Sequence, residues 1–407
     1  MKSTTICVIG GGAAGLMAAG TATLYGADVT VFEHMKVLGK KLAITGKGRC
    51  NVTNNTDINT FLNNVTKNPR FLYSALNNLS PEDTMQLFEG LGVQLKTERG
   101  NRVFPQSDKA RDIVDALITY ASDAKIIHEK VKAIIPCDTG FTVKTDKEYI
   151  FDKVIIATGG KSYPLTGSDG SGYRLCSRLG HKVTELIPSL IPISSNSSIC
   201  CELQGLSLKN VAIKITGPEG KPLYDDFGEM MFTHFGLTGP MILSASAHLR
   251  AFDISTLTLS IDLKPALDEK ELDARLLSDF KANTNRDFIN SLSALLPSKM
   301  IEPFVYKTGI DPRKKVNLLT REERFIILKT LKEFTIPLSG YRPIEEAIIT
   351  SGGVDVKEIS PKTMESKLIP GLYFAGEVID VDAYTGGFNL QIAFSTGYTA
   401  GMNAAQA

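Results

Sequence analysis

Tryptophan is absent from this 407-residue chain, and cysteine and histidine are scarce, with six and five residues. No two cysteines form a C-x-x-C pair, which argues against a zinc site and against a thioredoxin-like redox site. Cys200 and Cys201 are direct neighbours, and a disulfide between neighbours is strained and rare. No two histidines stand at metal-ligand spacing, so we expect no metal. The sparse cysteines suit a reducing compartment.

Long apolar runs and an excess of charge of one sign are also absent. No stretch approaches the roughly 18 apolar residues of a membrane-spanning helix, and the N-terminus lacks the pattern of a signal peptide. Lys and Arg number 45 against 44 Asp and Glu, a net charge of +1. Global charge therefore gives no reason to expect nucleic acid or an anionic membrane as a partner. We expect a cytoplasmic protein that acts on a small-molecule substrate.

A glycine-rich turn follows the first predicted strand. Residues 4–9 are β-branched and apolar, as in a buried strand, and residues 13–25 are rich in Ala, Leu and Met, as in a tightly packed helix. Between them, Gly10 allows a tight turn, Gly12 leaves room for a pyrophosphate and Gly15 lets the helix pack on the strand. The helix N-terminus presents unpaired N–H groups to the phosphates. The pattern predicts a dinucleotide site.

Glu33 adds the second part of this motif. It ends the next predicted strand, 18 residues after Gly15. A carboxylate there can accept hydrogen bonds from both hydroxyls of an adenosine ribose, whereas it would repel a ribose 2′-phosphate. The site therefore suits FAD or NAD and disfavours NADP.

The C-terminal region favours FAD over NAD. Gly376 and Glu377 follow the predicted strand 372–375, and Asp380 precedes a second glycine-started helix that begins around Gly387. A nicotinamide enzyme does not need its C-terminus to return to the first sheet. A flavin enzyme benefits from this return, because N–H groups of the C-terminal helix can then face the flavin pyrimidine, where reduced flavin gathers negative charge.

The order of strand-like and helix-like segments along the chain predicts an α/β fold with insertions. The pattern of alternating strands and helices covers 1–189 and 353–407 and indicates a Rossmann-type domain. Short alternating segments predict an inserted β domain, with a first part at 190–265 and a return at 336–352. Polar, helix-periodic residues predict a helical subdomain at 266–335.

Several segments together resemble one bacterial flavoprotein family. They are GGGAAGLMAA, LGKKLAITGKGRCNVTN, VIIATGG, FTHFGLTGP and YFAGEVIDVDAYTGGFNLQIAFSTG, and they span nearly the full length. The family includes enzymes named aminoacetone oxidase and a bile-acid reductase, and many uncharacterised NAD(P)/FAD-dependent oxidoreductases. The resemblance implies a glutathione-reductase-like FAD-binding Rossmann domain that carries an inserted β-barrel-like domain and a helical subdomain.

The resemblance also implies a set of cofactor-binding residues. The glycine loop would hold the pyrophosphate, Glu33 the ribose, the 40–51 loop the stretch toward the flavin, and Val131 the adenine through its backbone. His34 stands where similar sequences often carry Lys or Arg. The full set is Gly10, Gly12, Ala13, Ala14, Gly15, Glu33, His34, Lys40, Lys41, Thr45, Gly46, Arg49, Cys50, Asn51, Val131, Ala157, Thr158, Gly159, Gly376, Glu377, Asp380, Gly387, Asn389, Leu390 and Gln391.

No acid–base pair stands out, so the catalytic residue stays open. His234 in FTHFGLTGP is the candidate, beside a predicted helix with Thr238 as N-cap, although a structural role for this histidine is the more ordinary interpretation. Cys50 has no suitably spaced resolving cysteine, so we expect it to pack and not to act as a redox partner.

The function indicated is hydride transfer between non-covalent FAD and a small organic substrate in a cavity between the FAD domain and the inserted domain. One alternative is an NAD(P)H-dependent reductase of an unsaturated or keto substrate. NAD(P)H would then be a transient electron donor, because no second dinucleotide motif follows a strand elsewhere. Another alternative is an RNA-binding or assembly protein that uses FAD structurally, with the basic segment 311–315 as a contact.

Overall fold

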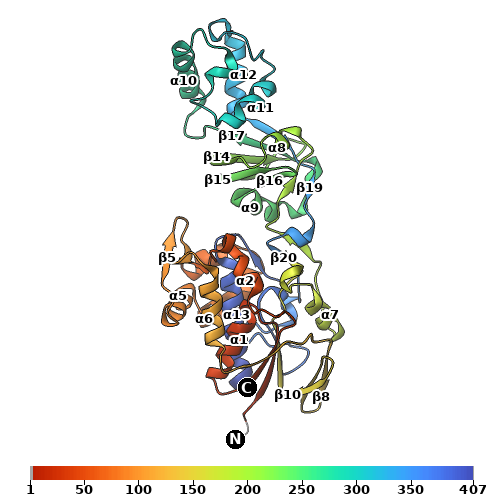
Figure 1. Ribbon diagram of the computed structural model, residues 1–407. Helices are drawn as coiled ribbons and strands as arrows, with labels where there is room; N and C mark the ends of the chain where they lie inside the picture. The colour runs from red at the N-terminus through yellow and green to blue at the C-terminus, as the bar shows by residue number, and fades with distance from the viewer. Residues whose placement is uncertain (1–2, 407) are drawn as a thin grey trace. The chain divides into compact units, whose positions relative to one another are not determined.

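The computed structural model describes residues 3–406 and divides into two compact units (Figure 1). Unit 1 contains the chain up to Ser189 and again from Pro343 onward, and unit 2 comprises Leu190–Arg342. The chain therefore crosses from one unit to the other twice.

A five-stranded parallel sheet forms the centre of unit 1, in the order β21-β11-β1-β2-β7. The bounds of these strands are β1 Thr5–Ile9, β2 Asp28–Phe32, β7 Lys125–Ile127, β11 Lys153–Ile156 and β21 Leu372–Phe374. The last strand in the sequence thus lies in the same sheet as the first. This sheet confirms the predicted Rossmann-type α/β fold, in which ligands bind beyond the carboxyl ends of the strands.

Helices α1 (Ala13–Leu24) and α13 (Phe388–Gln406) pack closely against each other beside this sheet (Figure 1). Gly397 and Gly401, one turn apart on α13, make the close approach possible. A Cβ atom at Gly401 would lie 2.3 Å from the carbonyl oxygen of Ala18, and one at Gly397 would lie 2.5 Å from that of Ala14. The absence of side chains therefore sets the distance between the N-terminal and C-terminal helices.

Shorter elements complete unit 1. Its further helices are α2 Lys40–Ile44, α3 Ile58–Asn63, α4 Tyr73–Asn78, α5 Pro81–Gly90, α6 Ala110–Tyr120 and α7 Ser171–Arg178. Its small antiparallel sheets contain β3 Thr53–Asn54, β5 Leu95–Glu98 and β6 Arg102–Pro105; β8 Ala133–Cys137, β9 Gly140–Lys144 and β10 Glu148–Phe151; β4 Val65–Lys67 and β22 Asp382–Ala383; and β12 Ile187–Ser189 and β20 Ile349–Ser351.

Unit 2 is built on a seven-stranded antiparallel sheet, in the order β18-β17-β14-β15-β16-β13-β19. The bounds are β13 Ile193–Ser194, β14 Ser207–Thr216, β15 Pro222–Thr233, β16 Gly236–Thr238, β17 Thr258–Asp262, β18 Phe334–Pro337 and β19 Gly340–Tyr341. The two edge strands β18 and β19 are separated in sequence by only Leu338 and Ser339. Such a short connection requires the sheet to curl until its edges meet, which gives the barrel-like form expected from the sequence.

The helices of unit 2 are α8 Ser198–Glu202, α9 Pro240–His248, α10 Glu269–Ala282, α11 Ser298–Thr308 and α12 Arg321–Lys332. Capping boxes begin α10 at Asp268 and α12 at Thr320. Apolar residues of these helices, such as Leu276 and Leu331, share one continuous core with the sheet residues Ile213 and Leu259. The helical and β parts of unit 2 thus form one packed body.

Two sequence expectations need correction. The predicted β-domain return at 336–352 ends earlier, at Arg342, because Ile349–Ser351 pairs with Ile187–Ser189 inside unit 1. Thr238 is not the N-cap of α9. It pairs with Met231 in the sheet, and Gly239 is the N-cap of the helix. Gly239 has a φ of 103°, and a Cβ atom there would lie 2.9 Å from the Cα atom of Met230.

Among residues 3–406, no helix is both long enough and apolar enough to cross a membrane.

The close approach of α1 and α13 generates a stability prediction. Gly401→Ala should destabilise the protein by about 1–3 kcal/mol, because the added methyl group collides with the backbone of α1. Gly90→Ala is the matched control: Gly90 ends α5, and open space surrounds its Cβ position. The control should be neutral or stabilising by up to about 1 kcal/mol. Denaturant unfolding measures both variants, and equal free energies of unfolding would contradict this account of the packing.

Candidate functional site

The glycine loop between β1 and α1 is tight on one side and open on the other. Gly10 has a φ of 110°, and a Cβ atom there would lie 2.4 Å from the carbonyl oxygen of Ala157 at the end of β11. A Cβ atom at Gly15 would lie 1.8 Å from the carbonyl oxygen of Gly10. At Gly12, by contrast, nothing lies within 4 Å of the Cβ position. The three glycines therefore have the roles expected in a pyrophosphate-binding loop.

Glu33 follows β2 and is held by the backbone around it. The amide of Gly11 donates to Glu33 Oε2 at 2.8 Å, and the amide of Met35 donates to Oε1 at 2.7 Å. His34 Nδ1 lies 3.4 Å from the same Oε1 atom. Each carboxylate oxygen has a further lone pair, so the fixed carboxylate can still accept a hydrogen bond from a ribose hydroxyl.

Polar atoms without partners mark the space beyond β11. Within residues 3–406, Thr158 Oγ1, Ser168 Oγ and Asn51 Oδ1 are buried and have no hydrogen-bond partner. Glycines approach two of these atoms closely: a Cβ atom at Gly159 would lie 3.0 Å from Ser168 Oγ, and one at Gly172 would lie 1.8 Å from Thr158 Oγ1. Buried polar groups of this kind are costly unless a ligand or water satisfies them. A polar, extended ligand fits this set.

The C-terminal segment closes onto the N-terminal loop. A Cβ atom at Gly376, two residues after the end of β21, would lie 2.7 Å from the Cβ atom of Ala14 in the first turn of α1. A Cβ atom at Gly387, before α13, would lie 2.3 Å from the backbone of Thr53. The structure thus brings the two glycine motifs together, although more than 350 residues separate them in the sequence.

Glu377 is the centre of a polar network. Its carboxylate accepts from Lys41 Nζ at 2.7 Å, from the amide of Thr350 at 2.8 Å and from Ser162 Oγ at 3.2 Å. Lys41 also donates to Ser162 at 2.8 Å. A Cβ atom at Gly160 would lie 2.4 Å from Glu377 Oε1, so this glycine is required beside the network.

Arg49 faces acidic partners in the structure. Its guanidinium donates to Glu98 and Asp108 and lies 4.1 Å from the ring centroid of Phe104. The hydrogen bond from Arg49 lowers the pKa of Glu98, and those from Lys96 and Arg49 lower the pKa of Asp108. In the structure the guanidinium pairs with carboxylates beside the β5–β6 hairpin. A cofactor contact of Arg49 therefore stays a prediction.

Cys50 is fully buried and has a φ of 59°. Burial raises the pKa of its thiol to about 12, so the thiol stays protonated near neutral pH. Its amide donates to the carbonyl oxygen of Thr45 at 3.1 Å. These features fit packing in the 40–51 loop and argue against a thiolate nucleophile.

Other predicted residues use their side chains within the protein. Gln391 is buried and bonds Thr53 and Thr84, and Asn389 bonds the backbone of Ala383 on both sides. Asp380 pairs with Lys67 at 2.7 Å. Lys40 donates to the carbonyl oxygen of Leu165, and Thr45 donates to that of Leu42. Val131 is buried, with 6% of its surface exposed. Any contact of these residues with a cofactor stays a prediction.

Three further polar residues lie beside the predicted ones, namely Ser162 and Thr350 at Glu377 and Ser168 at Gly159, and the sequence did not predict them as site residues. The segment 166–173 contained a usable signal, because its glycine-rich turn precedes α7 and carries Ser168. Thr350 had no such signal, since its proximity to Glu377 depends on tertiary structure.

His234 belongs to unit 2. It is exposed in the turn between β15 and β16, its carbonyl oxygen accepts from Cys201 Sγ, and its ring packs edge-on against Phe235. Its catalytic role stays a prediction.

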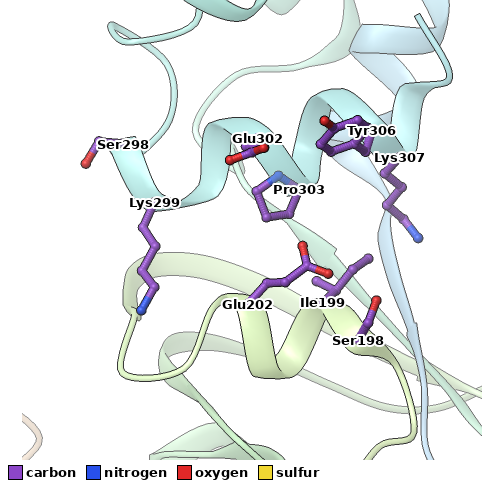
Figure 2. A pocket seen from close by; sticks show the side chains of 9 residues that line it. All are labelled: Ser198, Ile199, Glu202, Ser298, Lys299, Glu302, Pro303, Tyr306 and Lys307. Atoms are coloured by element: carbon purple, nitrogen blue, oxygen red, sulfur yellow. The ribbon is translucent and has the colours of Figure 1, made fainter. Parts of the chain in front are cut away.

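Unit 2 also contains a groove of about 810 Å³ between α8 and α11 (Figure 2). Figure 2 shows the carboxylates of Glu202 and Glu302 and the side chains of Lys299 and Tyr306 along this groove. None of the predicted site residues lines it, and its mixed charge defines no ligand class.

Comparison with known proteins assigns a family to this geometry. The family model described as HI0933-like protein Rossmann domain matches residues 4–403. The chain is 28% identical to the 3-dehydro-bile acid delta(4,6)-reductase of Clostridium scindens over 410 residues, which cover 98% of this chain and 99% of that protein. It is 30% identical to the ribosomal RNA dihydrouridine synthase of Escherichia coli over 403 residues, covering 98% and 97%.

Solved structures agree on the fold. The 3-ketosteroid delta1-dehydrogenase from Sterolibacterium denitrificans matches with a TM-score of 0.52 at 12% identity, covering 99% of this chain and 100% of that chain. At this identity the likeness concerns the fold alone. The family and fold expected from the sequence are confirmed.

The geometry of Glu33 predicts the effect of replacing it. Glu33→Ala should weaken FAD binding about tenfold to a hundredfold, because a charge-assisted hydrogen bond is worth roughly 1.5–3 kcal/mol. Glu33→Gln should weaken FAD binding less, since the amide keeps one acceptor. Titration of flavin-stripped protein with FAD measures both dissociation constants. An unchanged dissociation constant in Glu33→Ala would show that this carboxylate does not bind the ribose.

Proposed function

The chain belongs to the HI0933-like Rossmann family, and on this basis we propose that it is an FAD-dependent reductase of carbon–carbon double bonds conjugated with a carbonyl group. The chain is an oxidoreductase of the flavoprotein type. The proposal concerns its reaction and its substrate class.

The names of the two relatives carry this proposal. Read as chemical nomenclature, a 3-dehydro-bile acid delta(4,6)-reductase and a dihydrouridine synthase both add hydrogen to a carbon–carbon double bond. In a 3-oxo-4-ene and in the uracil ring, that double bond is conjugated with a carbonyl group. Their shared reaction type is a more secure guide than either substrate, because both relatives cover nearly the whole chain at similar identity.

The residues of unit 1 would bind and orient the cofactor. The open Cβ position at Gly12 and the N-terminus of α1 suit the pyrophosphate, and the fixed carboxylate of Glu33 suits the ribose. Thr158 and Ser168 offer buried polar atoms to the stretch beyond it. When bound, FAD supplies the hydride donor and acceptor.

The reaction balances with one hydride and one proton. The hydride goes to the alkene carbon β to the carbonyl, the proton goes to the α carbon, and a two-electron donor restores the reduced flavin. NADH or NADPH would serve as this donor through transient contact, since the sequence has a single dinucleotide motif. His234 is a candidate for orienting the substrate or supplying the proton.

A second candidate substrate is a uracil ring within ribosomal RNA. The 30% identity to the ribosomal RNA dihydrouridine synthase over 98% of this chain favours it. The net charge of +1 gives no general attraction to RNA, so such a substrate would require a local contact surface.

The test compares electron acceptors under anaerobic conditions. Holoenzyme reduced with NADPH or dithionite is mixed with a 3-oxo-4-ene steroid, with uridine-containing ribosomal RNA, or with buffer, and the flavin absorbance at about 450 nm is followed. We expect rapid return of the oxidised flavin spectrum with one acceptor and a product heavier by two hydrogens. The matched control is the same acceptor with its double bond already saturated, which should leave the flavin reduced.

Reoxidation by neither alkene, together with flavin reduction by an amine substrate, would overturn the reductase proposal in favour of an oxidase. Reoxidation only by RNA would select the second substrate and keep the reaction type.

A further inference from the structure

The two segments that cross between the units are both bonded to one buried carboxylate. Asp382 in β22 is 0% exposed. Ser189 Oγ, at the end of the outgoing strand β12, donates to Asp382 Oδ2 at 2.9 Å. Ser351 Oγ, on the returning strand β20, donates to Asp382 Oδ1 at 2.9 Å. Thr66 Oγ1 of β4 adds a third hydroxyl donor at 2.8 Å.

This arrangement is specific to the crossing strands. Strands β12 and β20 pair with each other, with Ser189 opposite Ile349 and Ile187 opposite Ser351. Ser189 is the last residue of unit 1 before the chain enters unit 2, and the chain returns to unit 1 at Pro343, shortly before β20. The two carboxylate oxygens of Asp382 therefore accept hydrogen bonds from different connecting strands, one from β12 and the other from β20.

The same carboxylate is joined to the predicted flavin-binding end of the site. Asp382 is followed by Ala383, whose amide donates to Asn389 Oδ1 at 2.9 Å and whose carbonyl oxygen accepts from Asn389 Nδ2 at 2.8 Å. Asn389 lies in the first turn of α13, whose N-terminus is predicted to face the flavin. A second carboxylate of this segment, Glu377, accepts from the amide of Thr350 in β20.

We propose that Asp382 is a positioning residue that couples occupation of the flavin site to the order of the two crossing strands. A ligand that fixes the N-terminus of α13 fixes Ala383 through Asn389, and Asp382 then presents both oxygens to Ser189 and Ser351. Burying a carboxylate costs free energy unless hydrogen-bond donors satisfy its oxygens, so the position of Asp382 depends on its hydroxyl donors. The inference depends on FAD binding alone and not on the substrate proposed above.

Hydrogen–deuterium exchange of the holoprotein and of the flavin-stripped protein tests this coupling. In the natural sequence, FAD should slow amide exchange about tenfold or more in peptides covering 183–191 and 346–354, since loss of one hydrogen bond to a charged group corresponds to about tenfold to a hundredfold. In Asp382→Asn, FAD should still bind, but its effect on these two peptides should fall below about twofold. The serines bond different oxygens of Asp382, so replacing one oxygen by an NH2 group removes the acceptor of one serine, and the bond to the other serine is no longer charge-assisted.

The matched control is Asp57→Asn. Asp57 lies in the same unit and also accepts from a hydroxyl, Thr60 Oγ1, but it caps α3 on the surface. It should leave the FAD-dependent slowing in both peptides unchanged. A purely structural role of Asp382 would raise exchange equally with and without FAD, and this result would overturn the proposal.

Single hydroxyl removals keep the proposal testable if Asp382→Asn does not fold. Ser189→Ala and Ser351→Ala each remove one of the three hydroxyl donors named above. Each should reduce the FAD-dependent slowing in the peptide that carries the substitution more than in the other peptide. Full retention of FAD-dependent slowing in both variants, or its absence in the natural sequence, would overturn the coupling. Neither outcome depends on the identity of the substrate.

Discussion

Close approach between segments at the carboxyl ends of β1, β11 and β21 is the constraint on which the site depends. A Cβ atom at Gly10 would meet the backbone of Ala157, and one at Gly376 would meet the Cβ atom of Ala14. Farther along α13, Gly401 lets this helix reach the backbone of α1. A side chain at any of these points would separate segments that must meet for one ligand to touch them all. Because these contacts leave the Cβ position of Gly12 open, the same packing that closes the fold also creates room for a pyrophosphate.

Three carboxylates of unit 1 have hydrogen-bond partners that fix their positions. Glu33 accepts from two backbone amides, and Glu377 accepts from Lys41, Ser162 and the Thr350 amide. Asp382 accepts from the hydroxyls of Thr66, Ser189 and Ser351. Glu377 and Asp382 both come from the C-terminal segment after β21, and both bind β20. This segment therefore joins the predicted flavin-binding end of the site to the strands that precede and follow unit 2, and the proposed coupling would act through these bonds.

Local sequence patterns predicted the first β-α-β unit and its dinucleotide motif. The apolar strand at 4–9, the glycine spacing and the position of Glu33 lie within one β-α-β unit, so periodicity and spacing suffice. The bond between Ser189 and Asp382 joins residues 193 positions apart, and no local pattern encodes it. Likewise, the attraction of Arg49 to Glu98 and Asp108, and the earlier end of unit 2, depend on which strands pair in three dimensions.

The stoichiometry of flavin in the purified protein shows whether unit 1 binds FAD. We expect about one FAD per chain, released into the supernatant by acid precipitation, since no histidine or cysteine stands in a flavin-attachment motif. Identification of the released flavin by chromatography distinguishes FAD from FMN. A colourless protein that does not take up added FAD would contradict FAD binding, and colour that stays with the precipitate would contradict non-covalent binding.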